Sequence, residues 1–391
     1  MTITERPARR SFMSRHDCRL EDLRAIVEQP AGEFPLSNEV RSGVPVYRAA
    51  TLRRLITADG DDRNARDELA WVLADGPGIF VIEGAFERDV VDRATAEFRA
   101  MIAQQHAEGR AVGDHYAKPG ANDRVWNAIE KLAAQAPEVF VDYYANDMIA
   151  LGARAWLGPG YQISSQVNVV NPGGAAQSPH RDYHVGFMTD DEAEDYPAHA
   201  HLLSPVLTLQ GAVAHCDMPV ESGPTMYLPH SQKYPPGFLA WRRAGFIEYF
   251  TANYTQLPLS LGDVVFFSPA LFHGAGTNHT PDIARMANLI QVSSAMGRAM
   301  ETMDRIRMSK AVYEVLAGRA AAGMDPALVR HAATAAADGY AFPTNLDKDP
   351  PLDGLTPASH LDIMVTALAE QATAAEFGRR IDALVERRAS V

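Results

Sequence analysis

Between residues 160 and 295 the chain alternates short apolar runs with turn residues, and this pattern constrains the fold more than any other feature. Runs rich in Val, Ile, Leu and Phe are separated by segments that contain Gly, Pro and Asn. The expected strands cover residues 161–170, 205–214, 224–228, 263–268 and 286–294. Several short strands with turns between them are typical of an antiparallel sandwich or barrel. The sequence therefore predicts a mainly β core in this region.

Helical patterns flank the β region. Residues 76–86 form a short apolar run that predicts a buried strand. Residues 87–105 follow with apolar side chains at helical spacing. After residue 296 the chain is rich in Ala and mostly helical in pattern, interrupted by a loop at 340–357 that contains Pro and Asp. This loop is expected either to cover a pocket mouth or to tether two helices.

Three parts of the chain are therefore expected. Residues 1–70 mix charged residues, Pro and Gly and are interpreted as an N-terminal extension. Residues 71–295 form the β domain with added helices. Residues 296–391 form a helical C-terminal extension, which packs either on this core or on a second subunit of a homo-oligomer.

Composition narrows the class of protein. Hydrophobic residues make up 47% and charged residues 22% of the 391 residues, which is typical of a globular protein. The formal net charge of -13 argues against a nucleic-acid partner, because duplex binders carry a basic face. The two cysteines, Cys18 and Cys216, form no CxxC pair, so neither a disulfide framework nor a structural zinc site is expected. No secretory signal or long apolar run is present, which predicts a cytoplasmic protein without a membrane partner.

Three His-x-Asp triplets are candidates for a metal site. They begin at His180, His215 and His360, and among 13 histidines one such triplet is expected by chance. On a strand, residues i and i+2 point the same way, so a His and a carboxylate at this spacing can bind one metal ion. A second His from elsewhere completes a facial triad that leaves three positions open on iron.

The surroundings favour the first triplet. No His follows the triplet at His360, which also lies in a helical pattern. The triplet at His215 leads directly into a turn and is interpreted as a strand-end or core histidine. His180 and Asp182 follow a Pro- and Gly-containing loop and have His273 downstream. The sequence therefore predicts a metal site formed by His180, Asp182 and His273, with His184 on the same strand face.

Four segments in this order resemble the phytanoyl-CoA dioxygenase family. They are the strand and helix that begin at residue 76, SPHRDYH at 178–184, ESGPTMYLPHSQK at 221–233 and LGDVVFFSPALFHGAGTNHTPDIAR at 261–285. The resemblance spans about residues 71–295. It differs in one motif, where His230 stands at a position that is usually Gly, and in a second, where Ala275 stands in place of Ser or Thr.

The resemblance implies a fold, cofactors and further site residues. The family fold is a double-stranded β-helix, a cupin-like jelly roll with helices packed on one side. Family members use Fe(II), 2-oxoglutarate and O2. By residue-level correspondence, His180, Asp182 and His273 match the iron ligands, and Arg285 matches the arginine that pairs with the distal carboxylate of 2-oxoglutarate, for which a guanidinium fork is suited.

Further residues are expected near the cosubstrate or the substrate. The candidates for cosubstrate binding are Thr277, in place of the missing hydroxyl at Ala275, together with Gln166, Asn168 and Lys118. The candidates for the substrate pocket are His184, His115, Tyr116, Arg124 and Trp126.

The expected reaction is hydroxylation of an unactivated C–H bond of a small-molecule metabolite, with release of succinate and CO2. Desaturation or ring chemistry on the same site stays open. Halogenation is disfavoured because Asp182 occupies the position that related halogenases leave open for chloride. Two alternatives stay open from the sequence: an iron oxygenase of this fold that does not use 2-oxoglutarate, and a catalytically silent binding scaffold. The substrate is not specified by any motif.

Overall fold

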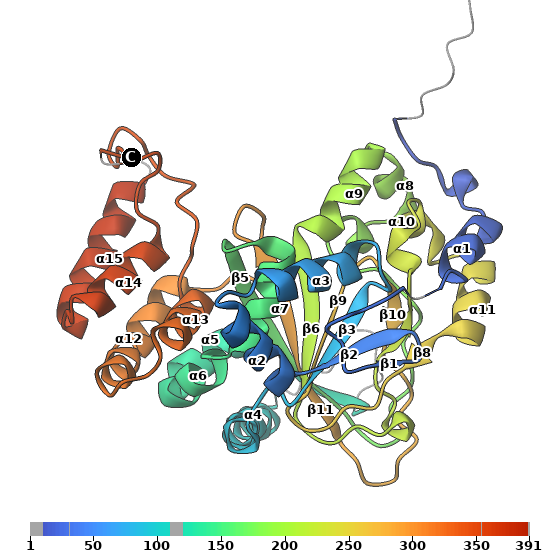
Figure 1. The fold of residues 1–391 in the computed structure, drawn as a ribbon, viewed down its shortest axis with the longest axis horizontal. Coiled ribbons are helices and arrows are strands. Elements are labelled where there is room, and N and C mark those ends of the chain that lie inside the picture. The colour runs from blue at the N-terminus through green and yellow to red at the C-terminus, as the bar shows by residue number, and fades with distance from the viewer. Residues whose placement is uncertain (1–10, 31, 110–119, 353, 390–391) are drawn as a thin grey trace, which may run out of the picture.

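The structure, a computed structural model, describes residues 11–30, 32–109, 120–352 and 354–389 (Figure 1). Two β-sheets form its core, an eight-stranded sheet of order β1-β2-β3-β9-β6-β11-β5-β4 and a three-stranded sheet of order β10-β7-β8. The large sheet contains β1 (Glu39–Arg41), β2 (Val44–Arg48), β3 (Ile79–Glu83), β4 (Asn122–Val125), β5 (Tyr161–Val170), β6 (Thr208–Ala214), β9 (Val264–Phe267) and β11 (Arg285–Ser294). The small sheet contains β7 (Met226–Leu228), β8 (Thr255–Gln256) and β10 (Phe272–Gly274). All neighbouring strands are antiparallel except the β2–β3 pair.

Helices cover one face of the large sheet (Figure 1). They are α2 (Ala49–Asp59), α3 (Arg63–Ala74), α4 (Arg88–Ala107), α5 (Ala128–Gln135), α6 (Pro137–Tyr144) and α7 (Asp147–Leu157), joined by α12 (Arg305–Ala321) and α13 (Pro326–Ala336). The expected mainly β core of jelly-roll type with flanking helices is therefore confirmed.

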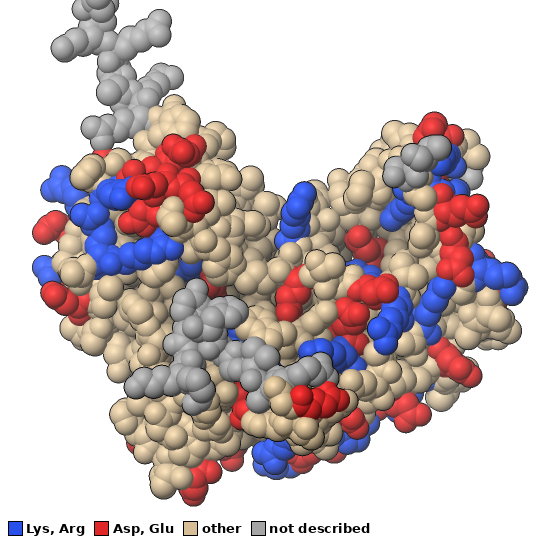
Figure 2. Space-filling view, turned by 180° about the vertical axis from the view of Figure 1, so that it is seen from behind, with Lys and Arg blue, Asp and Glu red and all other residues tan. Residues whose placement is uncertain are grey.

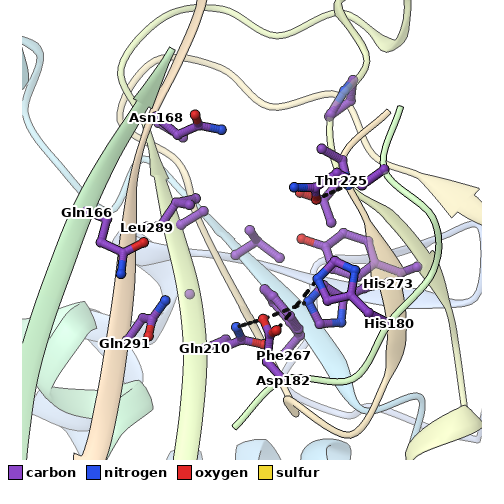
Figure 3. A pocket seen from close by; sticks show the side chains of 18 of the residues that line it. Gln166, Asn168, His180, Asp182, Gln210, Thr225, Phe267, His273, Leu289 and Gln291 are labelled. Carbon is purple, nitrogen blue, oxygen red and sulfur yellow. Dashed lines mark hydrogen bonds and ion pairs between the residues drawn. The ribbon is translucent and has the colours of Figure 1, made fainter. Parts of the chain in front are cut away.

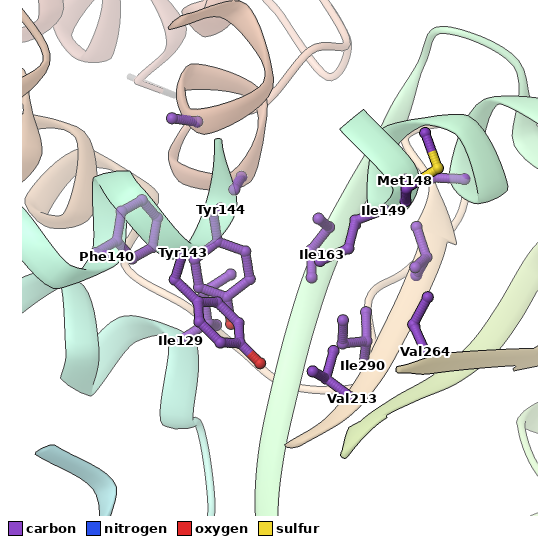
Figure 4. Packing of buried hydrophobic residues seen from close by; sticks show 14 of the residues in the cluster. Ile129, Phe140, Tyr143, Tyr144, Met148, Ile149, Ile163, Val213, Val264 and Ile290 are labelled. Carbon is purple, nitrogen blue, oxygen red and sulfur yellow. The ribbon is translucent and has the colours of Figure 1, made fainter. Parts of the chain in front are cut away.

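Strands of the large sheet bury side chains on both faces. In β9, Val264 and Phe266 belong to the core between sheet and helices, whereas Val265 and Phe267 belong to the core between the two sheets. This alternation follows from the two-residue repeat of a strand. Apolar runs on both sides are required because one face meets helices and the other meets the small sheet. Figure 4 shows the helical side of this core, where Ile163, Val213 and Ile290 of the sheet face helices α5 to α7.

The N-terminal residues contribute directly to the large sheet. Strand β2 pairs with β3 in parallel, and β1 pairs with β2 at the sheet edge. Tyr47 of β2 is fully buried in the apolar core, and its hydroxyl donates a 2.8 Å hydrogen bond to Glu68 of α3. Residues 39–74 thus pack with the β domain. The short helix α1 (Leu20–Val27) lies instead near the small sheet, where Leu23 packs with Phe272.

The C-terminal helices pack on the helical layer of the same chain. Helix α12 contacts α5 and α6, while α14 (His360–Ala369) and α15 (Ala374–Arg388) complete the outer end of the molecule (Figure 1). Residues 345–349 of the expected loop lie against α15, because the Asn345 side chain donates to the backbone carbonyl of Arg388 at 3.0 Å and Arg387 pairs with Asp349 at 2.8 Å. Of the two roles expected for this loop, the structure supports the tether between helices.

The remaining short helices lie around the small sheet and one end of the core. They are α8 (Asp190–Glu194), α9 (Ala198–Val206), α10 (Gly237–Ala240) and α11 (Ala244–Asn253). Figure 2 shows a broad notch between the C-terminal helices and the region of α8 and α9, and basic and acidic side chains lie interspersed on this face. Within the described ranges, none of the helices has the length and apolar character needed to cross a membrane.

Candidate metal centre and cavity

His180, Asp182 and His273 lie together at the facing surfaces of the two sheets (Figure 3). The backbones of His180 and His273 pair reciprocally, with N–O distances of 2.9 and 3.2 Å. Nε2 of His273 lies 3.3 Å from Oδ2 of Asp182, and Nε2 of His180 lies 3.7 Å from Oδ1. One ligand atom from each residue lies within 4.8 Å of the other two. These three side chains therefore converge on one point, as predicted.

Each histidine is oriented by a backbone carbonyl two residues earlier in the chain. Nδ1 of His180 lies 3.0 Å from the carbonyl oxygen of Ser178, and Nδ1 of His273 lies 2.9 Å from that of Leu271. A carbonyl only accepts hydrogen bonds, so Nδ1 carries the proton in both rings. Nε2 is then left with its lone pair facing Asp182, which is the arrangement of a metal-binding histidine.

The Asp182 carboxylate is held in its ionised form. Burial acts to raise its pKa, but the neighbouring imidazoles of His180 and His273 and the hydrogen bond from Gln210 outweigh this effect and lower the pKa well below its usual range. Gln210 donates from Nε2 to Oδ2 at 2.5 Å. Two neutral imidazole nitrogens and one carboxylate form the donor set of a facial triad for Fe(II). The residues present thus fit this metal.

Arg181 lies between the two ligands in the chain. Its side chain extends in the direction opposite to theirs and anchors this segment. Its guanidinium is buried, lies over the rings of Phe238 and Phe272, and donates to the carbonyl oxygens of Ser231 and Tyr234 at 2.5 and 3.1 Å. Burial lowers its pKa to about 9, so it stays charged at neutral pH. This anchor turns His180 and Asp182 toward the interior of the jelly roll.

A cavity of about 830 Å³ opens in front of the triad. Alternate residues of the large sheet form one wall, and Figure 3 shows Gln166, Leu289 and Gln291 on the side of the cavity opposite His180 and His273. Most of the remaining wall is apolar, with Phe267 of β9 close to the ligands. A largely buried cavity with a few convergent polar groups is typical of a small-molecule site.

Arg285 is the first residue of β11 and lines this cavity. It is 6% exposed, and burial lowers its pKa to about 10, which keeps the guanidinium charged at neutral pH. Its Nη1 has no hydrogen-bond partner among the described residues. A buried cation with an unused donor provides a site for a carboxylate. Arg285 therefore lines the cavity as a buried cation, and its pairing with 2-oxoglutarate stays a prediction.

Some of the other site residues expected from the sequence line the cavity, and some lie outside the described residues. Gln166, Asn168, Arg124 and Trp126 line the cavity. Arg124 lies 4.7 Å from the ring centre of Trp126 and donates to Gln166 at 3.1 Å. Lys118, His115 and Tyr116 lie outside the described residues.

Thr277 and His184 occupy positions different from those expected. The Thr277 hydroxyl accepts from the backbone nitrogen of Ala176 at 3.0 Å, and Thr277 is absent from the described cavity lining. His184 does not continue the strand face of Asp182, which corrects that expectation. The backbone turns at Tyr183 and His184, with φ of 66° and 40°, into a 3-10 helix at His184–Phe187. Nδ1 of His184 consequently pairs with the Ser204 hydroxyl at 3.0 Å.

The two other His-x-Asp triplets have structural roles. His215 is buried between the Thr95 hydroxyl at 2.8 Å and the Tyr143 hydroxyl at 2.9 Å, on the helical side of the sheet. His360 begins α14, and Asp362 forms a capping box with Ser359 at its N-terminus. The interpretations of a core histidine and of a helical context are both confirmed.

Gln210, Thr225 and Gln291 are among the cavity residues that were missed from the sequence. Gln210 and Gln291 lie within strands that were expected, at residues 205–214 and 286–294. The two-residue alternation of Gln210 with Ala212 and Ala214 was a signal that could have placed Gln210 on the inner face of the strand. Its contact with Asp182 depends on long-range pairing of strands and left no local pattern.

Comparisons with known proteins give one family and several solved structures. The non-haem α-ketoglutarate-dependent epimerase SnoN from nogalamycin biosynthesis is 22% identical, covers 60% of this chain and 82% of its own, and has a TM-score of 0.41. AviO1 from Streptomyces viridochromogenes Tue57 is 20% identical over 57% of this chain and 93% of its own, with a TM-score of 0.42. EctD from S. alaskensis with bound Fe is 19% identical over 59% and 78%, with a TM-score of 0.43. No curated protein matches the chain.

The family match covers more than half of the chain and includes all three residues of the candidate metal centre. The sequence model described as phytanoyl-CoA dioxygenase (PhyH) matches residues 74–287. The chain is thus an oxidoreductase of the iron- and 2-oxoglutarate-dependent class, and it belongs to the phytanoyl-CoA dioxygenase family.

Proposed function

We propose that this enzyme hydroxylates a C–H bond of a small-molecule metabolite, with iron(II) held by His180, Asp182 and His273. One observation carries the proposal: Nε2 of both histidines and the Asp182 carboxylate converge at a cavity that also contains the buried Arg285. Both a metal-binding triad and a buried cation at one cavity support a site for a metal and a dicarboxylate.

The protein residues have separate tasks in this proposal. Bound iron(II), together with 2-oxoglutarate and O2, supplies the oxidation that yields succinate, CO2 and a hydroxylated product. Arg285 binds the distal carboxylate of 2-oxoglutarate through its guanidinium fork. Gln210 keeps the Asp182 carboxylate in one orientation, and the apolar wall around Phe267 excludes water.

The cavity supports a substrate of metabolite size. Sites for such ligands have volumes of roughly 300–1,000 Å³, and this cavity measures about 830 Å³. The presence of Asp182 supports hydroxylation over halogenation, because the carboxylate takes the position that a halide needs.

The test is succinate release from 2-oxoglutarate by the purified enzyme with iron(II), O2 and a panel of metabolites. Asp182→Ala removes one ligand, and we expect it to abolish succinate release. His279→Ala is a matched control, because His279 is exposed and lies six residues after His273. Near-normal succinate release by Asp182→Ala would contradict the proposed triad.

The same assay separates two alternative functions. O2 consumption without succinate would indicate an iron oxygenase of this fold that does not use 2-oxoglutarate. Failure of the wild-type protein to bind iron under anaerobic conditions would indicate a binding scaffold. The intact triad and Arg285 support the enzyme over the scaffold, since a scaffold has no need of either.

A further inference from the structure

Two glutamine side chains face the cavity as direct neighbours on adjacent strands. Gln210 of β6 pairs with Gln291 of β11 in the sheet register, and both line the cavity. They are 6% and 7% exposed. The side-chain oxygen Oε1 of each has no hydrogen-bond partner among the described residues. Two adjacent buried acceptors without protein partners indicate a site for a ligand that donates hydrogen bonds.

The orientation of the Gln210 amide follows from its partner. An ionised carboxylate only accepts hydrogen bonds, so the atom that faces Asp182 must be the amide nitrogen. Oε1 of Gln210 is therefore an acceptor directed away from Asp182. The Gln291 amide has no such constraint, so it can accept through Oε1 or donate through Nε2.

The amide pair and Arg285 lie at opposite ends of one strand face. Arg285, Ala287, Leu289 and Gln291 alternate along the inner face of β11 and all line the cavity. Arg285 and Gln291 are six positions apart, which corresponds to roughly 20 Å between their backbones at 3.3 Å per residue. The cavity thus has Arg285 at one end of this strand face and the amide pair at the other, and the amide pair is joined to the metal centre through the Gln210–Asp182 hydrogen bond.

Gln166 of β5, which accepts from Arg124, lies on one side of the amide pair, and apolar side chains border its other sides. Phe267 is the direct neighbour of Gln210 on β9, and Leu289 and Ala212 form the next pair along β11 and β6. These side chains offer no partner for a polar group. A ligand that fits this end therefore combines an apolar skeleton with one or two hydrogen-bond donors.

We infer that the Gln210–Gln291 amide pair is a substrate subsite that binds a hydroxyl or amino group on an apolar skeleton. The inference rests on the proposed function, because it assigns the Arg285 end to 2-oxoglutarate and leaves the amide end to the substrate. Oε1 of Gln210 only accepts hydrogen bonds, so its partner in the ligand is a donor rather than an ionised acid. The hydroxyl or amino group accordingly binds close to the metal centre, because Gln210 contacts Asp182.

The test measures binding to metal-free protein by isothermal titration calorimetry, so it does not depend on turnover. The probes share one apolar ring and are cyclooctanol, cyclooctylamine, methoxycyclooctane and cyclooctanecarboxylate. Methoxycyclooctane keeps an oxygen but lacks the donor. We expect the alcohol or the amine to bind about tenfold more tightly than the ether and the carboxylate, as one buried hydrogen bond provides.

Two variants assign the preference to the amide pair. Gln291→Met keeps the length of the side chain and removes the amide, so the alcohol or amine should lose its advantage while the affinity for the ether stays within about twofold. The unchanged affinity for the ether also shows that this variant folds. Gln291→Glu keeps an acceptor and adds a charge, so the amine should bind more tightly and the carboxylate more weakly. This variant separates an amine substrate from an alcohol.

Either of two results would overturn the inference. One is wild-type protein that binds the alcohol and the amine no better than the ether, including no binding at all. The other is a preference that survives in Gln291→Met. Succinate release and iron binding are measured separately on the wild type, so a wild type that turns over with iron but shows no donor preference refutes the subsite alone. Donor-selective binding without iron binding refutes the proposed function alone.

Discussion

Nε2 of Gln210 donates a 2.5 Å hydrogen bond to Oδ2 of Asp182, the same oxygen that lies 3.3 Å from Nε2 of His273. Gln210 lies on β6 of the large sheet, whereas His273 lies on β10 of the small sheet. The carboxylate is therefore held between the two sheets of the jelly roll. Its orientation depends on both sheets, which explains why the metal centre lies at their junction.

Gln210→Leu tests this positioning role. Partners that orient a metal ligand typically contribute 10- to 100-fold to metal affinity. We therefore expect the dissociation constant for iron(II) to rise by about 10- to 100-fold, with the thermal unfolding midpoint of the metal-free protein little changed. Anaerobic titration with iron(II) measures the affinity. Gln104→Leu, at an exposed position of α4, is the control and should bind iron as the wild type does.

Much of the fold and the triad could be predicted from the sequence because both depend on local patterns. Alternating apolar runs placed the central strands, and the extended His180–Asp182 pair needed only the two-residue repeat of a strand. His184 was misplaced because the positive φ at Tyr183 ends the extended backbone there. No Gly or Asn marks this turn in the sequence, since the surrounding structure rather than the residue type imposes it.

Contacts between strands that are far apart in the sequence account for the other features that the sequence did not predict. Strands β1 and β2 lie in a segment of mixed charge and Pro content, and their position follows from parallel pairing with β3. The amide pair exists only because β6 and β11 are neighbours in the sheet although Gln210 and Gln291 are 81 positions apart in the numbering. Such pairings leave no local signal. The division of the chain at residues 70 and 295 stays a prediction about domain organisation.

Arg285→Gln tests the cosubstrate end of the cavity. Removing one partner of a buried, hydrogen-bonded charge pair costs about 2–5 kcal/mol, which corresponds to roughly 30-fold or more in affinity. We expect the KM for 2-oxoglutarate to rise by at least this factor, while iron binding without 2-oxoglutarate is unchanged. Arg285→Lys should recover only part of the affinity, because an ammonium lacks the bidentate fork. An unaltered KM in Arg285→Gln would place the cosubstrate elsewhere.

Gly237→Ala tests the anchor that orients the triad. A Cβ at this position would lie 2.0 Å from Cζ of the Arg181 guanidinium, which is itself confined by Phe238 and Phe272. We expect a loss of about 1–3 kcal/mol in the free energy of unfolding, as for other overpacked cores, and weaker iron binding. Denaturant unfolding measures the first effect.

Gly318→Ala provides the control for that substitution. Gly318 lies in helix α12, and a Cβ there would meet no atom within 4 Å. Helix propensity predicts that this change stabilises the protein by up to about 1 kcal/mol. Equal effects of the two glycine substitutions would show that the Arg181 guanidinium is not confined as the structure indicates.

The lowered pKa values of three buried histidines predict that the folded protein loses stability in acid. Burial lowers the pKa of His215 to about 3 and those of His230 and His360 to about 4, whereas an unfolded histidine titrates near 6.5. The unfolded chain then binds more protons below pH 6.5, so the full stability is present above this pH and is lost progressively toward pH 3–4.

His215→Gln should make this pH dependence shallower, because one buried titrating group is removed while hydrogen bonds to Thr95 and Tyr143 can still form. Urea unfolding midpoints of metal-free protein at pH 7.5 and pH 5 measure the effect. An identical pH dependence in the wild type and in His215→Gln would contradict the assignment of His215 as a buried neutral base.

The stoichiometry of iron(II) binding under anaerobic conditions tests the central claim most directly. Equilibrium dialysis of the wild type, of the three single variants His180→Ala, Asp182→Ala and His273→Ala, and of the control His279→Ala measures it. The metal centre described here predicts one tightly bound iron per chain in the wild type and in His279→Ala, with strongly weakened binding in each of the three ligand variants. Iron binding that persists undiminished in all three would contradict it.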